Sequence, residues 1–282
     1  MKKYLTATAA LLCATAATPA FAQDNPQGEF NGFYVGGSIG ATFSSDNDDE
    51  TILFDRDLNG TFGDTVTTAP PANANAFSTG FCGGSVGTSP TRPAAGCDSE
   101  NSAIEFSGRV GYDRQMGNFV LGGIVEVGTS DYSSSVTAFS TTPASYTFNR
   151  EVELLANARI RAGFTVTPTT LAYVTGGVGY AQLDNSFVTT NTANGVLRDL
   201  DDESIGFVLG GGIEQKIGRN VSVGVEYLYQ QYDDESTVRL NNSGTTSPTN
   251  PFLLGNASGT DFIRSDDSFN LHSVRAVVNF RF

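Results

Sequence analysis

The 282-residue chain has no tryptophan, two methionines, one histidine and three cysteines. No run of about eighteen apolar residues follows its first segment, which excludes a membrane-spanning helix from the rest of the chain. Helix-favouring stretches are also missing, whereas 32 glycines, 20 phenylalanines and 10 tyrosines favour strands joined by many turns. The composition therefore predicts a single all-β domain.

Positive charge is scarce as well. Without Lys2 and Lys3, which lie in the first segment, 16 − 2 = 14 basic residues stand against 30 acidic ones, a net charge of 14 − 30 = −16. Lys216 is then the only lysine. Binding to phosphates needs basic side chains, so nucleic acid is excluded as a partner. The acidic excess favours divalent cations or basic surfaces as partners.

The first 22 residues have the features of a secretory signal peptide. Met1 to Tyr4 is basic, Leu5 to Ala17 is apolar and small, and Ala20-Phe21-Ala22 fits the A-x-A cleavage pattern. Cys13 could mark a lipoprotein, but Leu12 precedes it where such signals need Gly or Ala, so we interpret Cys13 as part of the discarded signal. We expect a short N-terminal segment, residues 23–30, before the main domain.

Eight later segments alternate between apolar and polar residues with the period of two that is typical of strands. They cover roughly residues 31–45, 104–113, 119–127, 151–166, 171–182, 204–217, 221–230 and 268–282. The facing of segment 171–182 stays open, because glycine weakens the pattern there. Short turns follow the second, fourth and sixth segments. Long loops, at about 46–102, 133–149, 184–202 and 233–267, follow the others.

Short turns on one side and long loops on the other are the layout of outer-membrane barrels. An even number of strands also lets the first strand pair with the last, which removes both open edges. We therefore predict an all-β fold over residues 31–282, an eight-stranded antiparallel up-and-down transmembrane β-barrel with short periplasmic turns and long extracellular loops.

The sequence resembles the small eight-stranded outer-membrane surface antigens, which include opacity-type proteins and porin-family barrels. The matching motifs are Asn31-Gly-Phe-Tyr-Val-Gly-Gly37, Thr175-Gly-Gly-Val-Gly-Tyr180, the paired glycines of segment 204–217 and the ending His272 to Phe282. The resemblance implies the outer membrane of a Gram-negative bacterium, with lipid and lipopolysaccharide as surroundings. It also implies that the assembly machinery recognises the aromatic chain end, Phe280 and Phe282.

Charged residues recur on the face opposite the apolar one, which points into the lumen of an eight-stranded barrel. They are Glu105, Arg109, Glu126, Arg159, Arg161, Glu214, Glu226 and Arg275. We expect these charges to pair and plug the lumen. A structural or adhesin-like surface role in the loops follows from a plugged lumen, whereas a small porin with a narrow diffusion channel is the alternative.

The first loop holds two candidate sites. Cys82 and Cys97 are the only cysteines after the signal, and we expect them to form a disulfide, which persists outside the cytoplasm. Such a bridge closes a loop of about 16 residues, worth about 3 kcal/mol. Asp55, Asp57 and Asn59 have the spacing of calcium ligands, but Val66 stands where a bidentate Glu belongs. A solvated acidic loop is the alternative there.

His272 is the only imidazole. Some eight-stranded outer-membrane lipid deacylases place a Ser two residues after a lipid-facing His, but that position here is Val274, and Ser273 lies on the opposite face. We therefore expect no enzyme activity, no catalytic residue and no cofactor.

Overall fold

The computed structural model describes residues 29–44, 50–86, 97–98 and 102–282. The predicted signal peptide, residues 1–22, and most of the segment 23–30 lie outside the described residues. Among the residues described, no helix is long and apolar enough to cross a membrane.

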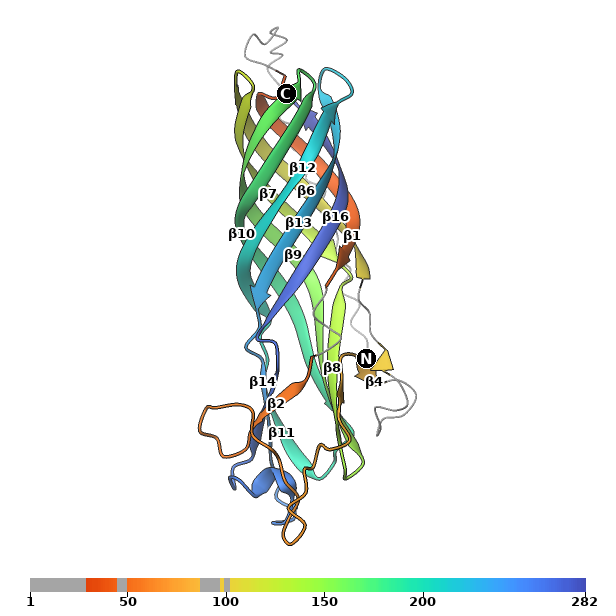
Figure 1. Cartoon of the computed structure of the whole chain (residues 1–282), viewed down its shortest axis with the longest axis vertical. Helices are drawn as coiled ribbons and strands as arrows, with labels where there is room; N and C mark the ends of the chain where they lie inside the picture. The colour runs from red at the N-terminus through yellow and green to blue at the C-terminus, as the bar shows by residue number, and fades with distance from the viewer. Residues whose placement is uncertain (1–28, 45–49, 87–96, 99–101) are drawn as a thin grey trace.

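Eight long strands form a closed antiparallel barrel (Figure 1). Each strand pairs with the next in the chain, and the last pairs with the first. The strands are β1 (Gly32–Phe43), β6 (Ser102–Met116), β7 (Phe119–Ser130), β9 (Ala144–Thr167), β10 (Thr170–Thr189), β12 (Glu203–Lys216), β13 (Val221–Asp233) and β16 (Ser268–Arg281). The predicted eight-stranded barrel is confirmed.

Side chains alternate between the lipid face and the lumen as the period of two predicts. On β12, Ile205, Leu209 and Ile213 are exposed, whereas Val208 and Glu214 are buried. The structure also assigns the facing of segment 171–182. Leu171 and Tyr173 point inward, whereas Val174 and Val178 face outward.

Aromatic rings gather on the outside of the barrel at the end with the short turns. Phe33 contacts Tyr112 at 4.8 Å between ring centroids, and Phe280 contacts Phe282 at 5.2 Å. Figure 1 places the C-terminus at this end. Such a ring of aromatic residues is typical of the interface between the bilayer and the periplasm.

Strand β9 departs from the predicted alternation at its extracellular end. Gln182 pairs with Leu154, but the next residue, Leu183, pairs with Val152, so Glu153 is an extra residue in β9. A bulge of this kind reverses the facing of the residues beyond it. Unbroken alternation along segment 151–166 predicts that Glu151 and Glu153 share the inward face with Arg159. That prediction is wrong, because both glutamates are exposed.

The sequence predicted long loops without strands, but the structure shows regular strands in these segments. Residues 133–149 form β8 (Ser133–Ser140) and the start of β9, which pair as a hairpin. A separate four-stranded sheet combines segments from three loops: β11 (Asn194–Asp199), β14 (Thr237–Asn242), β15 (Thr260–Arg264) and β2 (Ile52–Asp55). Smaller elements are β3 (Phe81–Cys82), β4 (Ser85–Val86), β5 (Cys97–Asp98) and the 3-10 helix η2 (Pro251–Leu253).

The extracellular strands enclose an aromatic core of their own. Phe262 of β15 is fully buried and contacts Phe54 at 4.8 Å, Phe252 at 5.5 Å and Tyr146 at 5.7 Å between ring centroids. Phe187 of β10 also belongs to this cluster. The barrel strands β9 and β10 therefore continue past the membrane and supply one wall of a folded surface domain.

Candidate functional site

The barrel interior holds a central cluster of six charged residues that connects five strands. Glu226 of β13 binds three arginines, with Arg275 at 2.5 Å, Arg109 at 3.0 Å and Arg159 at 3.3 Å. Glu126 of β7 binds the same three arginines at 2.6 to 3.3 Å. Glu105 adds a contact to Arg275 at 3.4 Å.

The central cluster balances its own charge. It contains three arginines and three glutamates, and all six residues are buried. Asn157 adds an uncharged link, since its Oδ1 accepts from Nε of Arg159 at 2.8 Å. A buried charge needs a partner to offset its lost hydration, and this arrangement supplies one for every charge.

A second ionic cluster lies nearer the short turns. Arg161 forms salt bridges with Asp113 and, at 2.8 Å, with Glu214. Arg281 binds the same two carboxylates at 2.9 and 3.4 Å. The ring of Tyr34 lies beneath both guanidinium groups, at 5.2 Å from Arg161 and 4.8 Å from Arg281. This cluster also balances its charge.

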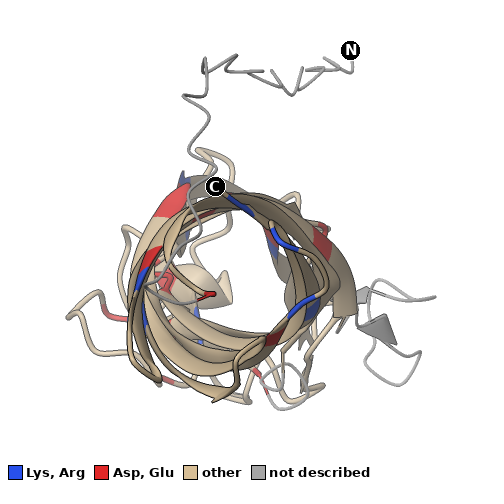
Figure 2. Ribbon diagram, turned by 90° about the horizontal axis from the view of Figure 1, so that it is seen from above, with Lys and Arg blue, Asp and Glu red and all other residues tan. Residues whose placement is uncertain are grey.

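The structure therefore brings the eight predicted interior residues into two neutral clusters. Two further members, Asp113 and Arg281, were not predicted, although both share the inward parity of their strands. Figure 2, seen along the barrel axis, shows basic and acidic residues distributed around the wall.

Apolar side chains fill the lumen beyond the central cluster on the extracellular side. The buried residues there are Tyr132, Val152, Leu155, Ala181, Leu183, Tyr232, Phe269 and Leu271. At the opposite end, Phe30 is fully buried and packs with Val120, Leu171 and Tyr173. Both flanks of the charged interior are thus occupied by apolar groups.

Two further salt bridges lie at the extracellular end: the first links β9 to the β13–β14 connection, and the second links β15 to the residue two positions before β2. Arg150 of β9 binds Asp234 at 2.5 Å, and Arg264 of β15 binds Glu50 at 2.5 Å. Neither pair was predicted, because Asp234, Arg264 and Glu50 lie in segments predicted to be loops. The long separation along the chain, 84 residues for the first pair and 214 for the second, leaves no local signal.

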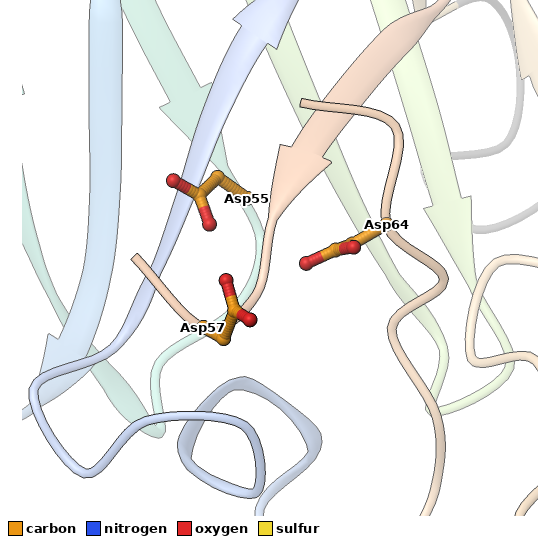
Figure 3. Close-up of side chains that lie close together, drawn as sticks. All are labelled: Asp55, Asp57 and Asp64. Carbon is orange, nitrogen blue, oxygen red and sulfur yellow. The ribbon is translucent and has the colours of Figure 1, made fainter. Parts of the chain in front are cut away.

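Two of the three predicted calcium ligands, Asp55 and Asp57, lie beside Asp64 (Figure 3). Carboxylate oxygens of Asp55, Asp57 and Asp64 lie within 4.8 Å of one another. Asn59 instead uses its side-chain oxygen to accept from the backbone of Thr61 at 2.8 Å. Asp64, and not Asn59, thus brings the third oxygen close to those of Asp55 and Asp57. Calcium binding stays a prediction.

The predicted disulfide can be placed only in part. The ladder between β4 and β5 pairs Val86 with Cys97, and β3, which ends at Cys82, lies just before β4. The side chain of Cys97 lies outside the described residues. The pairing of Cys82 with Cys97 stays a prediction.

His272 lies on the outer face of β16 within a group of aromatic residues. Its Nδ1 is 2.6 Å from the hydroxyl of Tyr227, and its ring stacks on Phe43 at 5.4 Å. Ser273 is buried on the opposite face, where its hydroxyl donates to Glu105 at 2.9 Å. These contacts give His272 a packing role at the outer surface and place the adjacent serine out of its reach.

The closed eight-stranded barrel, its aromatic girdle and its long surface loops define an outer-membrane barrel protein. The chain belongs to the family described as the outer membrane protein beta-barrel domain, whose model matches residues 64–282. The protein is therefore located in the outer membrane of a Gram-negative bacterium.

Two curated relatives, from Brucella melitensis and Brucella suis, are each described as a 31 kDa outer-membrane immunogenic protein. Each is 27% identical over 237 residues, which covers 77% of this chain and 89% of the relative. The crystal structure of the outer membrane protein OprG from Pseudomonas aeruginosa is similar in fold, with a TM-score of 0.51. It is 13% identical, and the match covers 92% of this chain and all of that one.

Proposed function

We propose that this protein is a surface-interaction barrel, in which the membrane part is a closed support and the extracellular sheet carries the activity. The observation that carries the proposal is the filling of the lumen. Two neutral ionic clusters are flanked by apolar side chains at both ends. A diffusion channel needs a continuous water-filled path. The two ionic clusters and the apolar side chains on either side of them occupy the space that such a path requires.

The extracellular domain supports the same proposal from the other side. Loops that merely join barrel strands need no core, yet these loops bury Phe54, Phe77, Phe252 and Phe262 together. A fixed surface reduces the entropy lost when a partner binds, because the loops are ordered beforehand. The immunogenic character named for the Brucella relatives is compatible with a large exposed surface of this kind.

Two measurements test the two halves of the proposal. Purified protein in planar bilayers should give no steady conductance, whereas defined steps from the unaltered protein would support the small porin instead. Cells carrying the protein should also adhere to protein-coated surfaces more than cells carrying a variant in which a short turn replaces residues 235–266. Equal adherence, with equal amounts of both barrels in the outer membrane, would contradict a surface role.

A further inference from the structure

The wall of the extracellular domain has an unpaired edge where β10 leaves the barrel. The ladder between β10 and β12 ends at Gln182 and Glu203, whereas β10 continues to Thr189 alongside β9 alone. The next strand, β11, pairs with β14. Among the described residues, no backbone ladder joins β10 to β11.

The direction of the free backbone groups follows from the hydrogen bonds at both ends of this stretch. Thr190 donates its N–H to Ser145 of β9 at 3.1 Å, whereas Leu183 donates away from β9, to Asp202 at 2.8 Å. Backbone groups alternate in direction along an antiparallel strand. The N–H and C=O groups of Asn185, Phe187 and Thr189 therefore point away from β9. The Asn185 side chain donates to the carbonyl oxygen of Asp201 at 2.7 Å, so the chain before β12 lies against Asn185, and the open part of the edge is at Phe187 and Thr189.

Arg198 of β11 covers part of this edge with its side chain. Its Nε and Nη2 donate to the carbonyl oxygen of Phe187 at 3.4 and 3.2 Å. The guanidinium group thus takes the place of the N–H donor that a neighbouring strand would supply. None of the described residues accepts a hydrogen bond from the N–H of Phe187. Among the described residues, the exposed side chain of Arg198 is thus the only group that bonds to the outward-pointing backbone of Phe187.

The surface beside the edge is acidic and includes two exposed apolar side chains. Val188 and Leu197 are 57% and 55% exposed. Four exposed carboxylates lie on β10, on β11 and where the chain enters β12, at Asp184, Asp199, Asp202 and Glu203. None of the four forms a salt bridge with a described residue. Uncompensated charges of one sign raise the local concentration of oppositely charged partners.

We propose that this edge binds an extended, basic segment of a partner polypeptide as an added strand alongside β10. Backbone bonds to Phe187 and Thr189 would give affinity, as in other cases of strand addition. The carboxylates would select Lys or Arg at alternate positions, and Arg198 would swing aside. The inference deepens the proposed surface-interaction function and rests on it. Charged residues also protect exposed edges against pairing, and this protective role alone is the competing outcome.

The test uses the full mature protein folded in detergent and a fluorescent peptide in which Lys alternates with Val. Binding is followed by fluorescence polarisation, and hydrogen exchange reports on the amide of Phe187. Asp184→Asn should weaken binding about two- to fivefold, the range of a surface ion pair. Asp131→Asn removes the same charge from an exposed site on the β7–β8 connection and should leave binding unchanged. Arg198→Ala should strengthen binding, because it opens the edge and removes a like charge.

A second peptide separates strand addition from charge attraction alone. N-methyl groups on alternate backbone nitrogens keep every charge but remove the hydrogen bonds of an added strand, so this peptide should bind far more weakly and leave exchange at Phe187 unchanged. Equal binding of both peptides, or no binding of either, would overturn the inference. The bilayer measurement is independent of the peptide experiment. If the protein gives no conductance and the peptide does not bind, the inference about the β10 edge is rejected, but the proposal of a closed barrel is not.

Discussion

Arg275 and Glu226 stand directly opposite each other on β16 and β13, and Nη2 of Arg275 lies 2.5 Å from Oε1 of Glu226. A cross-strand pair in register needs no movement of the backbone to form its salt bridge. The same carboxylate serves Arg109 and Arg159 from strands on other sides of the lumen. The central cluster therefore ties the barrel wall together across its interior as well as around its circumference.

The first prediction concerns the stability of the second ionic cluster. Arg161→Ala leaves Asp113 and Glu214 with Arg281 alone, and an uncompensated buried charge costs about 3 to 5 kcal/mol. The variant should unfold at a clearly lower urea concentration than the unaltered protein. Ile160→Val, which changes the lipid-facing neighbour, should shift the midpoint little. Equal small shifts in both variants would indicate solvated interior charges.

The second prediction uses two glycines of β6. A methyl group on Gly111 would overlap the ring of Tyr34, the ring that lies beneath Arg161. Gly111→Ala should therefore destabilise the barrel by about 1 to 3 kcal/mol, the usual cost of overpacking. Gly108→Ala is the matched control, because no atom lies within 4 Å of its added methyl group. Thermal unfolding in detergent followed by circular dichroism compares the two, and equal losses would refute the argument.

The third prediction concerns acid and the extracellular domain. Burial raises the pKa of the Asp234 carboxyl, but the salt bridge with Arg150 and hydrogen bonds from Ser236 more than offset this, so the pKa lies below its ordinary value of about 3.9. A lowered pKa stabilises the folded state at pH values above the ordinary value, and this stability is lost as the pH falls below it. Hydrogen exchange in β14 should accelerate below about pH 4, before the barrel itself opens.

The matched variant for this measurement is Asp234→Asn. It should exchange faster in β14 already at neutral pH and respond less to acid, because the titrating carboxyl is gone. Asp131→Asn should keep the acid response of the unaltered protein. An unchanged acid response in Asp234→Asn would show that other carboxyls cause it.

The fourth prediction concerns the two cysteines of the first loop. Under non-reducing conditions, mass mapping of a digest should recover Cys82 and Cys97 in one linked pair of peptides, and reduction should separate them. The bridge should stabilise the loop by about 3 kcal/mol against its unfolded states. Recovery of both thiols in free form from a sample alkylated before digestion would reject the pairing.

The fifth prediction concerns the chain end. Phe282 is 60% exposed and donates its backbone N–H to Phe33 at 2.9 Å, so its loss removes little from the folded barrel. Removal of Phe282 should lower the amount of barrel inserted in cells, while the purified chain still folds in detergent. Phe119→Leu alters the same aromatic girdle and should insert normally. Normal insertion of the truncated chain would mean that the assembly machinery does not need this residue.

The barrel could be predicted from the sequence because lipid and lumen impose opposite demands on neighbouring residues. Ile205, Phe207 and Leu209 alternate with Ser204, Gly206 and Val208 whatever the rest of the chain does. The inward facing of Glu226 and Arg275 follows from the same rule, although their partners do not, because a salt bridge between distant strands depends on the shear of the barrel.

Two features had no signal in a single sequence. The bulge at Glu153 adds one residue to β9. In the sequence, however, segment 151–166 alternates as one continuous strand, in which Leu155 is the only apolar residue at a polar position. The surface domain combines Phe54, Phe187 and Phe262 from separate loops, so its apolar residues show no common period. Long-range packing defines both features, and periodicity is a local property.

The four-stranded sheet above the membrane takes its strands from three loops that are far apart in the sequence. Its outer surface therefore consists of discontinuous epitopes, each made of residues that become neighbours only after folding. A synthetic peptide copied from one loop contains at most the pairing of β14 with β15, which both lie in the fourth loop. Antibodies raised against the folded protein should lose most of their recognition when the chain is denatured, and a vaccine antigen based on this surface would have to include the barrel that assembles it.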